Sequence, residues 1–289
     1  MSFAETALLG AIAGATIYIG LPLGRVKAVG PRLRMALAMF SVGILAFIFM
    51  DVTSHGESVV ADALHAYKTT PNASLLHVIG LFAVLAVAFL AGTVGIATLE
   101  RRLRPKRPER PAPIAGGEQE AVLPAHLIER QREQGGAARR LALQTGITIA
   151  GAIGLHNFAE GLAIGVSAKT GAVGLATVLV VGFALHNTTE GFGIVGPLGG
   201  VRPSWRWLLL AGLLGGGPTF VGTLVGYQVH SEALELAFYA LAGGAILYVI
   251  GEIWTNMRRH GMRELGLWFI ALGFVVGIAT DLVVTYAGA

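Results

Sequence analysis

Long apolar stretches separated by shorter polar segments make up most of the chain. Eight of these stretches have about the 20 residues that a helix needs to cross a bilayer core of about 30 Å. They cover residues 3–23, 33–52, 75–99, 141–166, 173–198, 207–228, 236–254 and 265–286. The pattern predicts an all-α, polytopic membrane protein with eight transmembrane helices, in which residues 1–289 form a single transmembrane domain.

Composition excludes a soluble domain. Hydrophobic residues make up 54% of the chain and charged residues only 13%, against roughly 25% charged residues in soluble domains. The 41 glycines are typical of helices that approach one another closely in a membrane. The absence of cysteine excludes disulfides and thiolate metal sites. The first ten residues lack the basic region of a signal peptide, so we expect the first span to be retained.

The basic residues indicate how the spans are oriented. Of the 21 lysines and arginines, 19 lie in the first, third, fifth and seventh loops or at their edges, and only Lys68 and Lys169 lie in the others. Because cytoplasmic loops carry the excess of positive charge, we expect both termini on the outside. This placement explains the sequence pI of about 9.6 without a nucleic-acid partner.

Two loops are long enough to have a structure of their own. Residues 101–140 begin with a basic segment rich in proline, and we expect a cytoplasmic, largely disordered loop. Within it, residues 121–132 fit both an amphipathic helix on the inner leaflet and a solvated linker. Residues 53–74 should face the outside, where an ordinary solvated loop is favoured over a funnel for cations. The polar residues that raise this question are His55, Glu57, Asp62 and His65.

Two copies of the motif His-Asn-x-x-Glu-Gly lie in the fourth and fifth spans. One copy contains His156 and Glu160, and the other contains His186 and Glu190. Residues four apart share a face of a helix, so each copy points an imidazole and a carboxylate in the same direction. The flanking charges place both copies near the middle of the bilayer, on adjacent antiparallel spans. Two nitrogens and two carboxylates at one depth form a suitable ligand set for a divalent metal.

The cost of burying charge favours the metal. One charge near the bilayer centre costs roughly 2.5–3.5 kcal/mol on insertion scales, so two glutamates cost roughly 5–7 kcal/mol. A bound dication offsets this cost, and it requires neutral histidine and ionised glutamate. The alternative role of these histidines and glutamates is hydrogen bonding between helices. A matched pair of motifs favours metal binding over this alternative. Asn157 and Asn187 follow the histidines, and the sequence leaves open whether they are metal ligands, partners of ligands or packing amides.

Two other functions are compatible with histidine and glutamate inside a membrane. An intramembrane metal-dependent hydrolase is one, but the His-Glu-x-x-His motif of zincin-type peptidases is absent. A proton-coupled transporter of an organic solute is the other. A faint repeat favours a transporter, since residues 43–51 and 244–252 each run from a glycine to an acid in oppositely directed spans. Inverted repeats of this kind are common in transporters.

The paired motifs resemble those of the ZIP (Zrt/Irt-like) divalent-metal transporters, and the pattern is most similar to the bacterial GufA-like branch. The family signatures commonly read His-Asn-Phe-Pro-Glu-Gly and His-Asn-x-Pro-Glu-Gly, and here they read HNFAEG at 156–161 and HNTTEG at 186–191. By this resemblance Asp51 and Glu252 line the transport pathway. The metal-binding positions that the resemblance implies are His156, Asn157, Glu160, His186, Asn187 and Glu190.

Three departures from the family pattern matter. Ala159 and Thr189 replace the two prolines, so we expect the family's helix kink to be milder or to arise from glycines. The sixth span has Gly-Gly-Pro where the family often has Ala-Glu-Pro, and the missing glutamate at Gly217 favours one bound metal over two. The cytoplasmic loop lacks the histidine cluster that many members carry.

The resemblance implies a transporter and not an enzyme. It implies import of Zn²⁺, or of Fe, Mn, Co or Cd, by alternating access across the plasma membrane, here a bacterial inner membrane. Spans one, four, five and six would move against spans two, three, seven and eight. The metal is then the transported substrate, no organic cofactor is expected, and the implied partners are the lipid bilayer and a second copy in a homodimer.

Overall fold

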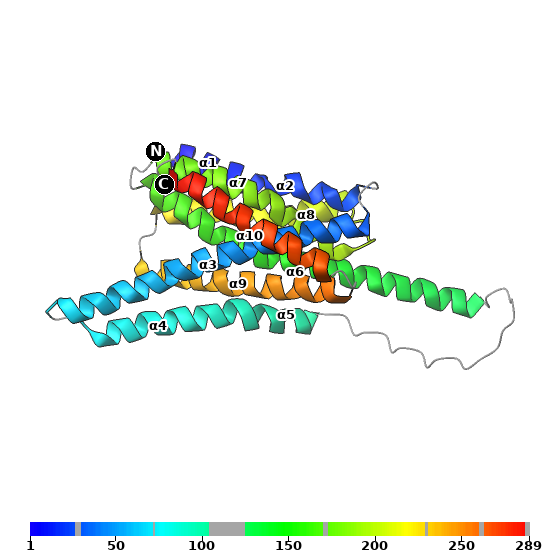
Figure 1. Cartoon of the computed structure of the whole chain (residues 1–289), viewed down its shortest axis with the longest axis horizontal. Coiled ribbons are helices and arrows are strands. Elements are labelled where there is room, and N and C mark those ends of the chain that lie inside the picture. Colours follow the sequence, from blue (N-terminus) through cyan, green and yellow to red (C-terminus); the bar gives the residue numbers. More distant parts are fainter. Residues whose placement is uncertain are drawn as a thin grey trace.

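The computed structural model of the chain is a bundle of helices that run along a common direction (Figure 1). It describes residues 1–26, 30–71, 73–103, 125–169, 173–228, 231–259 and 263–286, and no strand occurs within them. In chain order the elements are α1 (Phe3–Ala15), α2 (Ile17–Gly20), η1 (Leu21–Arg25), α3 (Pro31–Thr69), α4 (Leu75–Leu90), η2 (Ala91–Gly95), α5 (Ile96–Leu103), α6 (Ala125–Lys169), α7 (Val173–Val195), η3 (Gly196–Leu198), α8 (Trp205–Gln228), α9 (Glu232–Arg259) and α10 (Arg263–Tyr286). The predicted all-α fold is confirmed for the described residues.

Seven helical stretches within the described residues are long and apolar enough to cross a membrane. They are α1 with α2 and η1, α3, α4 with η2 and α5, α6, α8, α9 and α10. The fifth apolar stretch of the sequence forms α7, a helix of 23 residues, which is not among the seven. The structure therefore supports a polytopic helical membrane protein, whereas the eighth crossing and the outside termini stay predictions.

The segment expected to form the second loop is mostly helical. α3 continues through residues 53–69 and ends at Thr69, two residues before Pro71, and a proline disfavours helix in the residue that precedes it. The apolar stretch ends at Val52, but the helix continues beyond it. A change from apolar to polar residues does not by itself end a helix. The four polar residues predicted to lie in a loop are therefore on a helix, namely His55, Glu57, Asp62 and His65.

α6 begins well before the fourth apolar stretch. It starts at Ala125 and runs without a break to Lys169, while α5 reaches Leu103. The range 101–140, which the sequence predicts to be largely disordered, is thus helical at both ends. The first turns of α6 are rich in Ala, Leu, Glu, Gln and Arg, which favour helix. The segment 104–124 lies outside the described residues.

Five helices pack backbone against backbone through glycines. A methyl group at Gly14 of α1 would lie 2.2 Å from the carbonyl oxygen of Gly216 on α8, and one at Gly161 of α6 would lie 2.1 Å from that of Thr219 on α8. Gly20 of α2 meets the backbone of α7 in the same way. No larger residue fits at these crossings. We call α1, α2, α6, α7 and α8, with η1 and η3, the first helix group.

The other helices make a second set of close crossings. A methyl group at Gly43 of α3 would lie 2.1 Å from the carbonyl oxygen of Ile270 on α10, and one at Gly244 of α9 would lie 2.2 Å from that of Phe89 on α4. We call α3, α4, α5, α9 and α10, with η2, the second helix group. Gly43 and Gly244 are the first residues of the two copies of the faint repeat. The two copies thus make the same kind of contact, each through its first glycine with the backbone of another helix.

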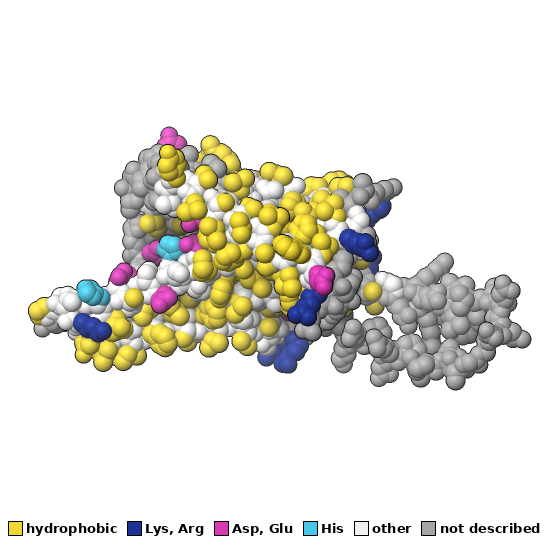
Figure 2. Space-filling view, in the orientation of Figure 1, with side chains coloured by type: hydrophobic (Ala, Val, Ile, Leu, Met, Phe, Trp, Pro, Cys, Tyr) yellow, Lys and Arg dark blue, Asp and Glu magenta, His cyan; other side chains and the backbone are white. Residues whose placement is uncertain are grey.

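The two ends of the bundle differ in character. Lys and Arg side chains gather toward one end in Figure 2, whereas His and acidic side chains lie mainly in a hollow toward the other. We call the end with Arg25 and Arg34 the basic end. The opposite end holds the N-terminus, whose amino group lies 3.5 Å from the carbonyl oxygen of Ala168. Between the groups, buried side chains such as Met39 and Ile194 form one continuous apolar core.

Candidate metal centre

Both motifs lie within unbroken helices. Residues 156–161 are in α6 and residues 186–191 are in α7, so each histidine and its glutamate share a helix face, as the spacing predicts. Ala159 is 2% exposed and suits a helix interior. The hydroxyl of Thr189 donates to the carbonyl oxygen of His186 at 2.7 Å. Neither substitute for the family's proline interrupts its helix.

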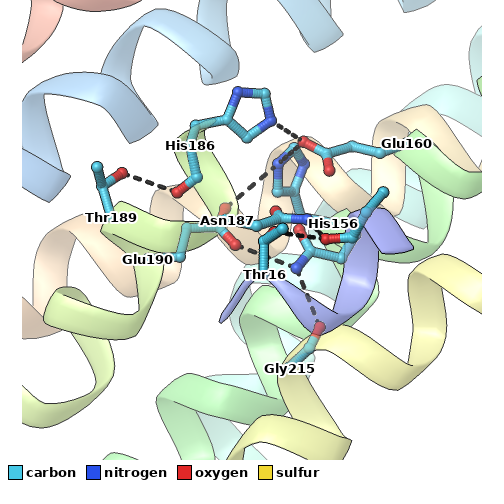
Figure 3. A network of polar contacts seen from close by, with 10 residues as sticks. Thr16, His156, Glu160, His186, Asn187, Thr189, Glu190 and Gly215 are labelled. Atoms are coloured by element: carbon cyan, nitrogen blue, oxygen red, sulfur yellow. Dashed lines mark hydrogen bonds and ion pairs between the residues drawn. The ribbon is translucent and has the colours of Figure 1, made fainter. Parts of the chain in front are cut away.

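Three side chains from the two motifs converge. The Oε1 atom of Glu160 lies 2.6 Å from Nε2 of His186 and 2.9 Å from Nε2 of His156. One ligand atom from each residue can be chosen so that all lie within 4.8 Å of one another. Figure 3 shows these side chains meeting between α6 and α7. This cluster of two imidazoles and a carboxylate is the best candidate for a metal centre among the described residues.

Glu190 lies at the edge of the cluster and is held by Asn157. The Nδ2 group of Asn157 donates to Oε2 of Glu190 at 3.0 Å and to the carbonyl oxygen of Gly215 on α8 at 3.0 Å. The other oxygen of Glu190, Oε1, lies 3.6 Å from Nε2 of His156. His156, Asn157 and Glu190 are fully buried. Three helices of the first group therefore fix the position of this second carboxylate.

Asn187 is anchored in a similar manner to a different helix. Its Nδ2 group donates to the carbonyl oxygen of Ala13 at 3.1 Å, which also accepts from the hydroxyl of Thr16 at 2.6 Å, where α1 gives way to α2. In Asn157 and Asn187 alike, the amide nitrogen is bonded to backbone of the first group, and the buried Oδ1 atom has no hydrogen-bond partner in the described structure. Each asparagine thus presents one unpaired oxygen.

A hollow between the two helix groups leads to the cluster. It has a volume of about 300 Å³, and His156, Glu160 and His186 line it. His186, the most exposed of the three side chains, is 14% accessible. From the second group, Asp51 and His55 line the same hollow, and Nδ1 of His55 lies 3.6 Å from Oδ1 of Asp51. Asp51, predicted as a pathway residue, therefore lines the same hollow as the cluster.

Two positions singled out from the sequence lie elsewhere. Glu252 is half-buried on α9 and does not line the hollow. A methyl group at Gly217 would meet only the side chain of Leu213 within 4 Å, and Gly217 lines a separate apolar groove on α8. Position 217 thus faces away from the cluster. A glutamate side chain at this position would start on the wrong side of α8 to reach the cluster.

Three polar residues that line the hollow were not predicted from the sequence, namely Tyr239, Thr280 and Asp281. For Asp281 the signal was available, because it is an acidic residue inside the last predicted span, where a charge is costly and marks a functional position. Tyr239 and Thr280 gave no comparable signal, since tyrosine and threonine are ordinary residues near the ends of membrane helices.

No family model matches the chain. The zinc transporter ZupT of Clostridium perfringens (strain 13 / Type A) is 25% identical over 232 residues, which are 77% of this chain and 80% of that protein. The zinc transporter GufA of Myxococcus xanthus is 35% identical over 136 residues, which are 45% of this chain and 53% of that protein. These relatives confirm the resemblance that the paired motifs indicate: the chain is similar to zinc transporters of the ZIP family and of its GufA-like branch.

Proposed function

We propose that the chain imports a divalent transition metal, Zn²⁺ foremost, into the cytoplasm by alternating access. The observation that carries this proposal is the convergence of His156, Glu160 and His186 from two helices, at the bottom of a hollow between the helix groups. A metal ion entering the hollow passes Asp51 and reaches the cluster. The ion is the transported substrate, and the proposal needs no organic cofactor.

The donor atoms suit such a substrate. Imidazole nitrogen and carboxylate oxygen bind Zn²⁺ well and also accept Fe²⁺, Mn²⁺, Co²⁺ and Cd²⁺. Two glutamates, Glu160 and Glu190, balance the charge of one dication, so the complex buries no net charge. The unpaired Oδ1 atoms of Asn157 and Asn187 are available as further oxygen ligands. We therefore propose one metal ion held by the two motifs.

The relatives favour transport over the other two functions. Both are named zinc transporters, and neither is named an enzyme or a carrier of an organic solute. A hydrolase would also need a general base that is free of the metal, whereas the two buried glutamates face the imidazoles. Transport of zinc is therefore the function that both the relatives and the donor set support.

The glycine crossings support a motion of the first helix group against the second. In the first group they join α1 and α6 to α8 and join α2 to α7, and in the second group they join α3 to α10 and α4 to α9. All six predicted metal-binding residues lie on the first group, so the bound ion would travel with it. The equivalent contacts of Gly43 and Gly244 fit an inverted repeat, on which alternating access commonly rests.

The distribution of charge indicates how the protein is oriented in the membrane. With the basic end in the cytoplasm, both termini and the mouth of the hollow face outside, which is the side from which an importer takes its substrate. We place the protein in the plasma membrane as a multi-pass protein with eight crossings, α7 included. A homodimer is the assembly that the family resemblance implies.

Uptake of Zn²⁺ by the purified protein in proteoliposomes tests this function. We expect the wild type to take up Zn²⁺ and the double variant His186→Ala with Glu190→Ala to fall to the level of empty vesicles, because it loses half of the donor set. His77→Ala is the matched control, since His77 also pairs with a glutamate, Glu232, but on the exposed surface. Undiminished uptake by the double variant would refute the site.

Metal content and competition test the finer proposals. Elemental analysis of the purified protein should give one Zn²⁺ per chain, because the two carboxylates of the motifs, Glu160 and Glu190, balance the charge of one dication. Competition with Fe²⁺, Mn²⁺, Co²⁺ and Cd²⁺ in the uptake assay should leave Zn²⁺ preferred. Two zinc ions per chain, both lost in the double variant, would show that the cluster is a two-metal centre.

A further inference from the structure

Arg34 is a buried cation at the basic end of the bundle. It lies on the first turn of α3 and is 8% exposed. The first turn of a helix carries the positive end of the helix dipole, so a cation is unfavourable there. Burying a guanidinium without partners is also costly. Groups outside its own helix must therefore stabilise Arg34 in this place.

Three carbonyl oxygens accept hydrogen bonds from its guanidinium. Nη2 donates to Val26 at 2.8 Å, and Nη1 donates to Gly199 at 3.0 Å and to Gly24 at 3.5 Å. The acceptors lie where η1 and η3 end, and carbonyl groups at helix ends attract cations. Gly199 has a φ of 58°, a left-handed conformation that glycine adopts without strain. We call Arg34 with these three carbonyls the Arg34 junction.

The Arg34 junction connects the two helix groups. Arg34 belongs to α3 of the second group, whereas η1 and η3 continue α2 and α7 of the first. Two other side-chain hydrogen bonds at this end lie within the first group: Arg25 donates to the carbonyl oxygen of Pro203, and Tyr18 donates to that of Leu209. A motion of one group against the other would therefore stretch the Arg34 junction while leaving these two bonds intact.

The seam beside the junction is closely packed. A methyl group at Gly196 would lie 2.4 Å from Cβ of Ala38, and one at Gly193 would lie 2.9 Å from Oγ of Ser41. Both contacts join α3 to the end of α7 and η3, between Glu190 and the basic end. The hollow approaches the cluster from the opposite side. In this structure the groups are thus apart on the outer side of the cluster and in contact on the basic side.

We infer that the Arg34 junction holds the basic end closed while the hollow is open, and that it breaks before the ion leaves toward the cytoplasm. This inference rests on the proposed alternating access. When the first group moves, η1 and η3 shift relative to α3, and the guanidinium loses its acceptors. Removing the junction should therefore shift the population toward a state with the basic end open and the hollow closed.

Single cysteines can report both ends, because the chain has none of its own. Ser41→Cys reports the seam beside the junction, and Thr280→Cys reports the hollow. Each is introduced into the full chain in proteoliposomes and labelled with a membrane-impermeant maleimide, the first from the basic side and the second from the opposite side. Adding Arg34→Ala should raise labelling at position 41 about tenfold, as expected for losing a hydrogen bond of a charged group, and should lower labelling at position 280.

Two further variants make the test specific. Arg32→Ala removes an exposed arginine of the same helix turn and should change neither labelling rate. Arg34→Lys keeps the charge but loses the planar guanidinium that reaches several acceptors. It should therefore change the labelling rates at positions 41 and 280 in the same directions as Arg34→Ala, but by a smaller factor. Labelling that rises at both positions would indicate local unfolding and overturn the inference, as would unchanged labelling in both Arg34 variants.

The labelling experiment and the uptake experiment can fail separately. Labelling reports how accessible each position is and needs no metal flux. If the labelling shifts as expected while the wild type takes up no metal, the Arg34 junction stands and the proposed function falls. If uptake depends on the motifs as expected while Arg34→Ala and Arg34→Lys leave labelling unchanged, the function stands and the Arg34 junction is only a structural contact.

Discussion

Asn157 positions a carboxylate of the candidate metal centre. One amide group holds Oε2 of Glu190 and the carbonyl oxygen of Gly215 at the same distance of 3.0 Å. The residue is fully buried, so neither acceptor has bulk water as an alternative partner. A buried carboxylate that loses its donor is poorly solvated, so it is expected to move or to take up a proton. Glu190 would then be a weaker ligand.

Asn157→Ala should therefore weaken Zn²⁺ binding by roughly one to two orders of magnitude, since a hydrogen bond to a charged group contributes about 1.5–3 kcal/mol. Isothermal titration calorimetry on the purified protein measures the change. Combining it with Glu190→Gln should cost less than the two single losses together, because Glu190→Gln removes the charge that the Asn157 bond stabilises. Thr148→Ala is the control, since its hydroxyl bonds only within α6. Strictly additive losses would contradict this role.

Protons and metal compete for the same atoms of the cluster. An imidazole in water titrates near pH 6.5, and a metal binds only its neutral form. Zn²⁺ affinity should therefore fall as the pH is lowered from about 8 to about 5, and the fall should be shallower in His186→Ala, which has one fewer competing site. Binding measured at fixed ionic strength across this range checks the slope. A pH-independent affinity would exclude both histidines as ligands.

At the scale of elements, the crossing of α6 and α8 determines where the first motif lies. Gly161 follows Glu160 directly, and a methyl group there would lie 2.1 Å from the carbonyl oxygen of Thr219. An added side chain has to push the helices apart, because backbone cannot turn aside as a flexible side chain can. Such a shift would move Glu160 relative to His186, which lies on α7.

Gly161→Ala should lower both the thermal unfolding temperature and the affinity for Zn²⁺. Gly151→Ala is a matched control on the same helix, since nothing lies within 4 Å of a methyl group there. In that open position alanine should be neutral or stabilising by about 0.5–1 kcal/mol, because glycine is the poorer helix former. Thermal unfolding in detergent with and without Zn²⁺ compares the two. Equal behaviour of the variants would show that the close crossing is not required.

At the scale of the whole molecule, the helical fold and the positions of the two motifs could be predicted from the hydropathy pattern, the repeated motif and the distribution of charge. The i, i+4 spacing within apolar stretches placed His156 and Glu160 on one face, and the structure brings them together with His186. The extension of α3 was missed because hydropathy marks the edge of a membrane rather than the end of a helix. The anchors of Asn187 and Arg34 could not be predicted, since their acceptors are backbone carbonyls, which every residue carries. The direction of Gly217 depends on helix rotation, which packing determines.

The number of crossings is the remaining whole-molecule prediction, and α7 decides it. If α7 crosses the membrane, Lys169 before it and Ser204 after it lie on opposite sides. If it does not, they lie on the same side and the bundle crosses seven times. By the positive-inside rule, the arginines near Ser204 predict a cytoplasmic location for that residue. A membrane-impermeant maleimide on intact cells should therefore label Lys169→Cys at once and Ser204→Cys only after permeabilisation. Labelling of both before permeabilisation would refute eight crossings, and with them the antiparallel pairing of the two motif helices.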